Sequence, residues 1–407
     1  MKITDIKALQ ILDSRGTPTI EVLMTSSTGN SVRYSVPAGA SKGEHEAHEL
    51  RDGGTDYSGQ AVTKAVHLIE TDIRDRLLSQ TILGQKEFDS HLAELDPSSN
   101  KEKLGGNTTL ALSAAYLRLS ALDRNLPIWK HVGEMFHTEA KFPRLFANLI
   151  NGGKHAPGLD IQEFMIVPTT NLPSQAAAEI SAVYAALQKA LAETFGPSAK
   201  LTGDEGGMAP IGPKSTDILD EFVRIKKELQ LDYDIALDVA ASSFYSDGHY
   251  HFEGTNLKPS EWITRLSALA QKYSIYSVED PAAEGDRSGF AQASQLENGY
   301  LVIGDDISVT DPDRIAELAQ SELIDGVIIK PNQIGTISQT FDAIVAARRG
   351  GLKVILSHRS GETNDATIAD IAYGVAADGI KLGAPRRGER VAKYNRLLEI
   401  ERGIDKT

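Results

Sequence analysis

The sequence predicts an α/β fold in which a (β/α) barrel follows a smaller α+β domain. In the second part of the chain, short buried strands are each followed by a helical segment, a pattern typical of a parallel barrel. The ends of six strand candidates are separated by 41, 26, 25, 28 and 23 residues, and one βα unit takes about this many. A chain of 407 residues is long enough for such a barrel and an accessory domain.

The chain begins with strand candidates. Residues 3–12 (ITDIKALQIL) and 19–27 (TIEVLMTSS) alternate like strands around the turn DSRGTP, and STGN at 27–30 is a hairpin turn. Residues 36–54 (VPAGASKGEHEAHELRDGG) follow as a loop rich in Gly and Ala, without the period of a strand or a helix.

The next region is helical. Residues 59–79 and 108–125 each show an apolar stripe at helical spacing. Strands followed by helices indicate a small α+β domain. Residues 131–143, which run into the sequence AKFPR, form the expected boundary. We therefore expect two domains, at residues 1–135 and 136–407.

The strand candidates of the second part share one feature, because each ends at a titratable residue. The strands are DIALDVA, IYSVED, LVIGDD, GVIIK, KVILSHRS and DGIKLG, and the residues are Asp238, Glu279, Asp305, Lys330, His358 and Lys381. In barrel enzymes the reactive groups lie at the C-terminal ends of strands. Packing accounts for one or two such residues, so six in succession indicate an active site.

Composition and charge limit the classes of function. The net charge is −14, from 42 basic and 56 acidic residues, which disfavours non-specific binding to nucleic acid or anionic membranes. The absence of cysteine excludes disulfides, a thiolate nucleophile and a cysteine zinc site. The charged N-terminal residues lack a cleavage pattern, and no uncharged apolar run has the length of a membrane span. We expect a soluble, cytoplasmic protein.

Asp238, Glu279 and Asp305 are candidate metal ligands. On adjacent barrel strands their carboxylates would converge on one point and raise one another's pKa values. A hard divalent cation relieves this repulsion, and a site of oxygen ligands alone suits Mg²⁺. The alternative is that each carboxylate caps the helix that follows it. One residue taken alone fits either interpretation, whereas three at barrel spacing favour the metal.

Lys330 and Lys381 are candidate bases. Lys330 directly follows the apolar run GVII, so it either reaches solvent or is held in a pocket. Two lysines near a metal would have lowered pKa values, and a lowered pKa makes lysine a usable base at neutral pH. Lys381 taken alone would also fit a surface lysine after a short strand.

Three polar segments are weaker candidates. TGDEGG (202–207) is typical of a turn, and His155 and Glu163 flank a loop that contains Gly and Pro. SHRSGE (357–362) offers hydroxyl, imidazole and guanidinium donors, which suit a phosphate or an oxyanion but also a polar turn. Taken with the metal and lysine candidates, these segments fit proton abstraction next to a metal-bound carboxylate.

The motifs of the chain resemble the enolase family over nearly the whole length. They occur in family order between residues 12 and 398: LDSRGTPTIEV, PAGASKGEHEAHELRDG, NKEKLGGNTTLALS, NGGKHA, IQEFMIVP, GDEGG, LDVAASSFY, VEDPAAEGD, GDDISVTDP, IIKPNQIGT, LSHRSGET and APRRGERVAKYNRLL. The resemblance implies a small α+β domain on an irregular ββαα(βα)6 barrel, as a dimer or a larger even oligomer. It also implies reversible, Mg²⁺-dependent dehydration of 2-phospho-D-glycerate to phosphoenolpyruvate, in glycolysis and gluconeogenesis.

The resemblance implies a catalytic set. Lys330 would remove the C2 proton of the substrate, and Glu205, with Glu163 beside it, would help the C3 hydroxyl to leave. Hydroxide is a poor leaving group, so a protonated carboxyl is required. His155, on a mobile loop, would complete the set.

The resemblance also implies two Mg²⁺ ions in each site, the second recruited with the substrate. Asp238, Glu279 and Asp305 would bind the first ion, which grips the substrate carboxylate. Ser41, on the other mobile loop, would help to bind the second as the site closes.

The substrate itself, a small phosphorylated molecule, would contact a wider set of residues. These are Gln162, His155, Glu163, Lys330, His358, Arg359, Ser360 and Lys381. Arg359 and Ser360 would hold the phosphate, and Lys381 would hold the carboxylate.

A few positions depart from the family pattern. Lys42 stands where Thr is usual, and Ala38 stands where Ser is common. The loop that contains Pro157 is one residue shorter, and Pro331 follows the candidate base. Two alternatives therefore stay open: a paralogue that acts on a phosphonate or another anionic analogue, and an additional non-catalytic scaffold or surface-binding role.

Overall fold

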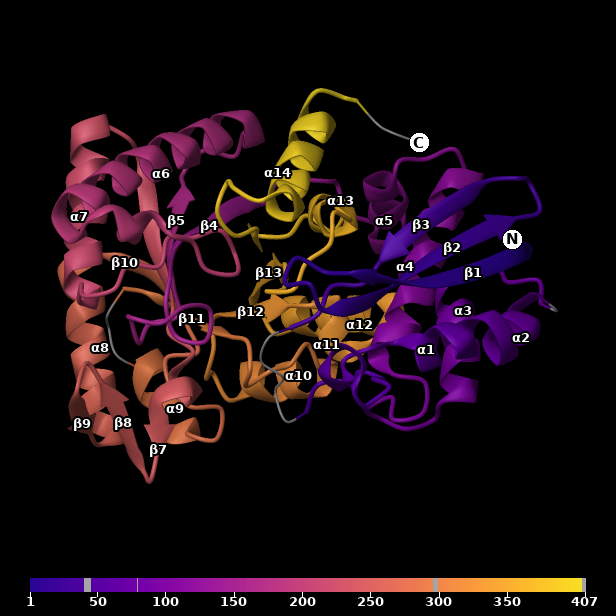
Figure 1. The fold of residues 1–407 in the computed structure, drawn as a ribbon, viewed down its shortest axis with the longest axis horizontal. Helices are drawn as coiled ribbons and strands as arrows, with labels where there is room; N and C mark the ends of the chain where they lie inside the picture. The colour runs from indigo at the N-terminus through magenta and orange to yellow at the C-terminus, as the bar shows by residue number, and fades with distance from the viewer. Residues whose placement is uncertain (40–44, 79, 296–298, 405–407) are drawn as a thin grey trace.

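A closed eight-stranded barrel and a three-stranded N-terminal sheet form the frame of the molecule (Figure 1). The computed structural model describes residues 1–39, 45–78, 80–295 and 299–404. The predicted fold class, an irregular barrel preceded by a smaller α+β domain, is confirmed. Within these ranges, none of the helices has both the length and the apolar character that crossing a membrane requires.

The N-terminal part combines an antiparallel sheet with helices, as its sequence patterns predict. The described elements are β1 (Ile3–Leu12), β2 (Pro18–Ser26), β3 (Ser31–Ser35), the 3₁₀ turn η1 (Asp56–Gly59), α1 (Thr63–Leu68), the π-helical turn η2 (Ile69–Ile73), α2 (Arg74–Leu78), α3 (Gln85–Leu95), α4 (Gly106–Asp123) and α5 (Ile128–Phe136). Each strand of the sheet pairs with the next along the chain. The segments α1, η2 and α2 follow one another directly and form the first predicted helix.

The barrel part begins with two strands and two helices, and six βα units follow. The described elements are β4 (Arg144–Asn151), β5 (Glu163–Pro168), α6 (Pro173–Phe195), η3 (Pro197–Lys200), α7 (Ser215–Leu229), β6 (Tyr233–Asp238), η4 (Ala241–Phe244), β7 (Tyr245–Ser246), β8 (His249–Phe252), β9 (Thr255–Leu257), α8 (Pro259–Tyr273), β10 (Ile275–Glu279), α9 (Arg287–Gln295), β11 (Leu301–Gly304), α10 (Pro312–Gln320), β12 (Gly326–Ile329), α11 (Pro331–Ile334), α12 (Ile337–Arg349), β13 (Lys353–Ser357), α13 (Thr367–Gly374), β14 (Gly379–Lys381) and α14 (Gly388–Glu401). The barrel closes in the strand order β10–β11–β12–β13–β14–β4–β5–β6. This order is the ββαα(βα)6 arrangement that the resemblance implies.

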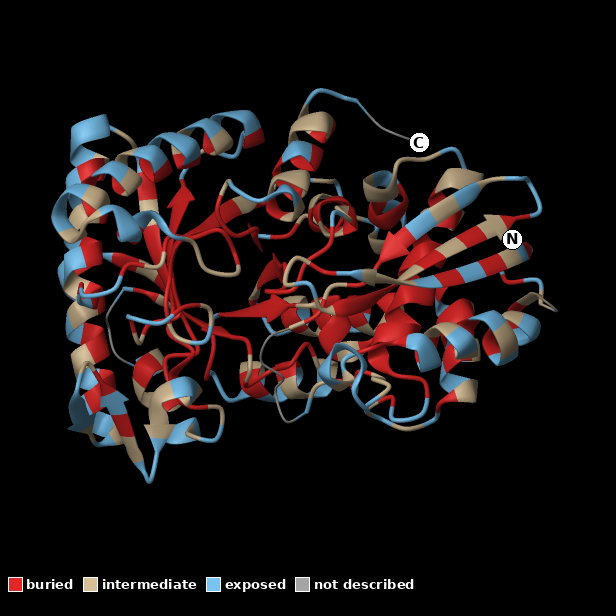
Figure 2. Ribbon diagram, in the orientation of Figure 1, coloured by how far each residue is buried: buried red, intermediate tan, exposed pale blue. Residues whose placement is uncertain are grey.

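Apolar side chains fill the barrel. Figure 2 shows that the barrel strands are largely buried and that many helices are buried on one side only. A separate cluster of buried side chains comes from barrel strands: Phe146, Met165, Val167, Ala236, Ile303, Ile328 and Ile355. Because such a core fills the interior, polar side chains at the strand ends gather at the rim.

The helix α4 joins the two parts of the chain. Its residues are buried on all sides, rather than along the single stripe that the sequence pattern predicts. It packs against β2 and β3 on one side and against α11 and α12 on the other. Thr109 also donates a hydrogen bond of 2.7 Å to the carbonyl oxygen of Gly335. The apolar core is therefore continuous between the two parts.

The departure at Pro331 has a local structural reason. Pro331 is the first residue of α11, where proline is favourable because the N–H of that position has no partner within the helix. Lys330 is consequently the residue that separates β12 from α11.

A short backbone pairing also holds the two parts together. Ala38 and Gly361 exchange hydrogen bonds of 2.7 and 2.9 Å. A Cβ atom on Gly361 would lie 2.3 Å from Oδ2 of Asp13 and 2.7 Å from the carbonyl oxygen of Ala38. Glycine is therefore needed at this point of close approach. The preceding residue, Ser360, is a candidate phosphate ligand, so the pairing fixes that segment against the N-terminal part.

We expect Gly361→Ala to lower the melting temperature, because the added Cβ must push Asp13 or Ala38 away. Overpacking of this kind lowers the free energy of unfolding by about 1–3 kcal/mol. Thermal unfolding measures the effect, and Gly285→Ala is the control, since nothing lies within 4 Å of a Cβ at Gly285. Equal melting temperatures for the two variants would contradict the close approach.

Candidate active site

The titratable residues that end the barrel strands lie together at one rim of the barrel. They are the last residues of β6, β10 and β14 and the first residues after β11, β12 and β13: Asp238, Glu279, Lys381, Asp305, Lys330 and His358, respectively. These six strands run parallel to one another within the barrel, and only β5 among the described barrel strands runs in the opposite direction. Their C-terminal ends therefore face the same side.

Glu163 joins this rim because β5 runs in the opposite direction. The strand β5 pairs antiparallel with both β4 and β6. Its first residue therefore lies where the other strands end, and Glu163 is in register with Asp238 on one side and Asn151 on the other. A residue that begins a strand in the sequence thus lies beside residues that end strands.

The ammonium group of Lys381 lies among three carboxylates. Its Nζ atom is 3.2 Å from Oε1 of Glu163, 3.2 Å from Oδ2 of Asp238 and 2.9 Å from Oε2 of Glu279. All four residues are at most 3% exposed, so solvent screens these interactions little. Lys381 is therefore a buried cation, not the surface lysine that the sequence alone also allows.

Lys330 is held in the same way, against Asp305. Its Nζ contacts Oδ2 of Asp305, and Nε2 of Gln333 donates to Oδ1 at 3.2 Å. The backbone N–H of Lys330 donates to Oγ1 of Thr310 at 2.9 Å. Asp311, and not Asp305, caps α10, with a side chain that accepts two backbone N–H groups. The helix-capping alternative therefore does not account for Asp305.

The carboxylates raise the pKa values of both lysines. Burial alone would lower the pKa of Lys330, but the charge of Asp305 outweighs it, as the charges of Glu163 and Glu279 do for Lys381. Burial likewise opposes ionisation of Asp305, yet Lys330 holds the pKa of that carboxyl below its usual value. The sequence analysis expects lowered pKa values for two lysines beside a metal. The carboxylates alone have the opposite effect and raise the pKa values of both lysines.

A surplus of carboxylates remains next to these ion pairs. Asp280, Asp305 and Asp306 bring one oxygen atom each within 4.8 Å of one another. Burial, and then the charge of Asp305, raises the pKa of Asp306 to about 7, and burial raises the pKa of Asp280. The other two predicted ligands, Asp238 and Glu279, share one ammonium group. This crowding of buried oxygen donors fits a hard divalent cation such as Mg²⁺.

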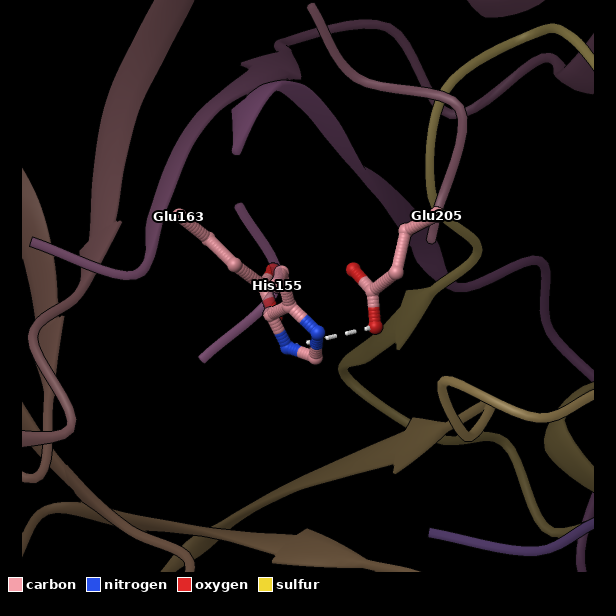
Figure 3. Close-up of side chains that lie close together, drawn as sticks. All are labelled: His155, Glu163 and Glu205. Atoms are coloured by element: carbon pink, nitrogen blue, oxygen red, sulfur yellow. Dashed lines mark ion pairs between the residues drawn. The ribbon is translucent and has the colours of Figure 1, made fainter. Parts of the chain in front are cut away.

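Glu163 and Glu205 form a second group, with His155 (Figure 3). Nε2 of His155 lies 3.7 Å from Oε1 of Glu163 and 3.6 Å from Oε1 of Glu205, and Asn148 donates to Oε2 of Glu205 at 2.8 Å. Burial and the charge of Glu205 raise the pKa of Glu163 well above its usual value. Burial opposes ionisation of Glu205 too, but His155 and His358 hold its pKa well below the usual value. The pKa values of the two carboxyl groups are thus shifted in opposite directions, which favours a shared proton on Glu163 over one on Glu205.

The segment after β13 presents anion-binding groups. The guanidinium group of Arg359 lies 2.9 Å from Oδ1 of Asn332 and 3.3 Å from the carboxylate of Glu46. Nη1 of Arg15, from the N-terminal part, lies 3.4 Å from Oγ of Ser360. Guanidinium and hydroxyl donors gathered in this way suit a phosphate group.

These groups line one narrow cavity of about 30 Å³. The predicted site residues in its lining are His155, Gln162, Glu163, Glu205, Asp238, Asp305, Lys330, His358, Arg359, Ser360 and Lys381. Gln162 donates to Oδ2 of Asp238 at 3.2 Å, and Glu279 lies against Lys381. The remaining predicted ligand, Ser41, lies outside the described residues, as does Lys42.

Three further residues support the site and were not singled out by the sequence. Asp280 accepts the backbone N–H groups of the two residues that follow β11, at 3.0 and 2.8 Å. Arg390, from α14, lies 2.6 Å from Nδ1 of His358. Asn148 is a polar residue within the apolar strand RLFANLIN, which is a usable signal, and Asp280 is the second acid of VED. Arg390 lies within the motif APRRGERVAKYNRLL, but nothing there distinguishes it from the neighbouring arginines.

The arrangement brings together several kinds of group. Lysines lie beside carboxylates that could hold a cation, two carboxyl groups lie beside one histidine, and a guanidinium lies next to a hydroxyl. Such a cavity suits removal of a proton next to a carboxylate and protonation of a neighbouring hydroxyl, on a substrate that carries a phosphate.

Comparison with known proteins places both parts of the chain in one family. Residues 3–132 match the family model described as enolase, N-terminal domain. Residues 139–407 match the model described as enolase, C-terminal TIM barrel domain. The two models together cover nearly the whole chain.

Curated relatives named enolase match over almost their full length. The protein of Methanocaldococcus jannaschii is 41% identical over 408 residues, 99% of this chain and 96% of the relative. That of Anaplasma marginale is 43% identical over 413 residues, 100% of this chain and 95% of the relative. That of Aeropyrum pernix is 42% identical over 407 residues, with 98% and 94% covered. With both domain models matched and this identity along its whole length, the chain belongs to the enolase family.

Proposed function

We propose that the chain catalyses the reversible dehydration of 2-phospho-D-glycerate to phosphoenolpyruvate and water. The observation that carries the proposal is one cavity in which Lys330 and the Glu163–Glu205 pair both lie. The reaction needs a base for the C2 proton and an acid for the C3 hydroxyl, and these groups supply both. Relatives named enolase support the same conclusion.

Lys330 is the proposed base for the C2 proton. It is half-buried at the end of β12 with its Nζ against Asp305, so it is held in the cavity instead of extending to solvent. Lys381 is proposed to hold the carboxylate of the substrate, because its ammonium already lies among carboxylate oxygens. A positioned base of this kind contributes roughly 10²–10⁴-fold to the rate.

Glu205 is the proposed acid, with Glu163 as its proton-sharing partner. In dehydration, the proton of the pair passes through Glu205 to the C3 hydroxyl, which leaves as water, while Lys330 keeps the proton from C2. In the reverse reaction, ionised Glu205 accepts a proton from the attacking water. His155 lies within 3.7 Å of both carboxyl groups and is proposed to keep them paired with the substrate bound.

Arg359 and Ser360 are the proposed phosphate ligands. The guanidinium of Arg359 lies beside the carboxylate of Glu46, and a phosphate offers the same kind of partner with more charge. Gln162 and His358 are proposed to line the pocket around the three-carbon chain.

Asp238, Glu279 and Asp305 are proposed to bind a first Mg²⁺. A second Mg²⁺, recruited with the substrate, is assigned to Ser41, which lies outside the described residues. Bound Mg²⁺ supplies positive charge that offsets the charge developing on the carboxylate of the substrate as C2 loses its proton. Asp305 supports the assignment through its place in the cluster with Asp280 and Asp306. Asp238 and Glu279 are linked to this site only through the ammonium of Lys381, which they share.

The proposal extends to the partner of the enzyme, its cellular location and its domain boundary. Its partner is a small phosphorylated substrate, and we place it in the cytoplasm, with which the absence of cysteine agrees. We keep the predicted boundary between the capping domain and the catalytic barrel, between residues 135 and 136, which falls before the last residue of α5.

We also propose that the chain forms a homodimer. The strand β1 lies at the edge of its sheet, and Leu9 and Leu12 on it are 42% and 55% exposed. A cavity of about 810 Å³ opens beside Leu12, and its lining includes the charged residues Arg33 and Glu399. Exposed leucines on an edge strand beside paired charges are typical of a surface that a partner covers.

We expect Lys330→Ala to lower the dehydration rate by roughly 10²–10⁴-fold, because the base is lost. The ultraviolet absorbance of the enolpyruvate product measures the rate, with Mg²⁺ or with EDTA. Lys353→Ala is the control, since Lys353 begins β13 at the opposite end of the barrel.

A second measurement separates the role of Lys330 as base from the role of Glu205 as acid. Exchange of the C2 proton with deuterated solvent, followed by NMR, should be lost in Lys330→Ala and kept in Glu205→Gln, which should fail only in dehydration. Exchange that persists in Lys330→Ala would contradict the assignment of the base. Wild-type protein that folds but does not turn over 2-phosphoglycerate would favour the paralogue.

We expect Mg²⁺ to raise the melting temperature of the wild-type protein but not of Asp305→Asn or Glu279→Gln. A ligand at 100 times its Kd adds about 2.7 kcal/mol to the free energy of unfolding. Thermal unfolding with and without Mg²⁺ measures the shift. Asp234→Asn is the control, because Asp234 lies in β6 but pairs with Arg144 at 2.6 Å. A shift retained in both site variants would reject these ligands.

We expect Leu12→Glu to convert the dimer into a monomer, because it buries a charge in the interface. Sedimentation velocity measures the mass. Leu83→Glu is the control, since Leu83 is 87% exposed and does not line the cavity beside Leu12. A Leu12→Glu protein that remains dimeric would place the interface on another face.

A further inference from the structure

The helix α14 carries a buried guanidinium group behind the active site. Arg390 lies in its first turn and is 0% exposed. Its Nη1 lies 2.6 Å from Nδ1 of His358 and also donates to the carbonyl oxygen of Arg359. Its Nη2 donates to the carbonyl oxygen of Ser360 at 2.6 Å and to that of Asp204 at 3.2 Å. One side chain thus connects the segment after β13 with the residue that precedes Glu205.

The contact with His358 determines which ring nitrogen carries the proton. A guanidinium group has only donors, so Nδ1 of His358 must accept, and the proton of the neutral ring is on Nε2. Nε2 lies 3.4 Å from Oε1 of Glu205. Burial lowers the pKa of His358 to about 4, and the charge of Arg390 acts in the same direction. The ring is therefore neutral, with a donor on the side of Glu205.

Glu205 then lies beside two N–H donors. Nδ2 of Asn148 donates to Oε2 at 2.8 Å, and the Nε2–H of His358 is the neighbour of Oε1. The donor on Oε2 orients the carboxyl group, and the Nε2–H beside Oε1 stabilises the anion that remains when the proton of Glu205 has gone to the C3 hydroxyl. With the opposite tautomer, the lone pair of Nε2 would face the carboxylate and repel it.

The same helix braces the adjoining backbone. One turn after Arg390, the ammonium of Lys393 contacts the carboxylate of Glu362 and donates to the carbonyl oxygen of Thr363 at 2.7 Å. Glu362 in turn accepts the backbone N–H of Arg359 at 3.1 Å. The first turns of α14 therefore hold the whole segment after β13.

We propose that Arg390 is a positioning residue for the dehydration step, because it sets the Nε2–H tautomer of His358 and so the orientation of the Glu205 carboxyl group. This inference rests on the proposed function. Arg390 touches neither substrate nor metal in it. The proton that leaves Glu205 becomes part of the water, and His358 keeps its own proton throughout.

The direct test reads the tautomer by ¹⁵N NMR of protein labelled at histidine, with the His358 signals assigned by their loss in His358→Gln. In the wild type we expect a protonated Nε2 and an unprotonated Nδ1. In Arg390→Met we expect the signals to move toward the Nδ1–H form, because the donor to Nδ1 is lost. Arg390→Lys, which keeps the charge without the fork of donors, should shift them in the same direction.

The kinetic test separates positioning from a general loss of stability. In both Arg390 variants we expect kcat for dehydration to fall by ~10-fold or more, with little change in KM and with C2 proton exchange retained. Leu397→Ala is the matched control, because Leu397 is a fully buried apolar residue of the same helix. It should lower the melting temperature and leave both the tautomer and kcat unchanged.

Each outcome decides one statement. A wild-type His358 protonated on Nδ1 overturns the inference even if no Arg390 variant folds. The inference about Arg390 is also overturned if Arg390→Met leaves the tautomer unchanged, or if the kcat of the Arg390 variants is no lower than that of Leu397→Ala. Turnover by the wild type would in that case still uphold the proposed function. Wild-type protein without turnover of 2-phosphoglycerate overturns the proposed function, and the dehydration role of Arg390 with it, whatever the tautomer.

Discussion

The structure depends on the neutralisation of negative charge that is buried at the rim of the barrel. Glu163, Asp238, Glu279 and Asp305 are nearly inaccessible to solvent, and isolated carboxylates are strongly disfavoured there. Two ammonium groups meet this demand: Lys381 contacts the first three carboxylates and Lys330 contacts the fourth. Such ion pairs add little to stability in themselves, because desolvation offsets the attraction. Their value is functional, since the same oxygen atoms suit a divalent cation and the same lysines suit an anionic substrate.

The barrel makes this concentration of charge possible through strand direction. Parallel strands end at one rim, so one residue at each strand end brings side chains from distant parts of the sequence together. The reversed strand β5 adds Glu163 from its beginning. Behind the rim, α14 supplies buried cations, Arg390 and Lys393, that contact the backbone and Glu362 but do not line the cavity. The residues that would touch the substrate are thus held from behind by these two cations, which bind only other protein atoms.

The sequence predicted the residues at the strand ends well, but it predicted poorly which side chains contact one another. Both results have a physical reason. A buried apolar run followed by a titratable residue is a local pattern, so Lys330 and Asp305 were located before any fold was known. The all-round burial of α4 was not predicted, because it depends on a barrel that follows later in the chain. Arg390 was missed because an arginine in the first turn of an amphipathic helix is common, and only the tertiary structure turns it inward. The raised pKa values of the lysines likewise depend on how many carboxylates share each ammonium.

Glu163 links the two halves of the site. One of its oxygens lies 3.2 Å from Lys381, which it shares with Asp238 and Glu279, and also 3.7 Å from His155 beside Glu205. Any carboxylate that draws Lys381 toward itself, or any cation that displaces it, therefore removes positive charge from Glu163, and any gain of positive charge beside Glu205 acts on the same shared proton. The carboxylates at the metal side and the acid at the other side are thus not independent. A single buried carboxyl group in register with Asp238 is enough to make the ionisation of the acid pair respond to what binds at the opposite wall of the cavity.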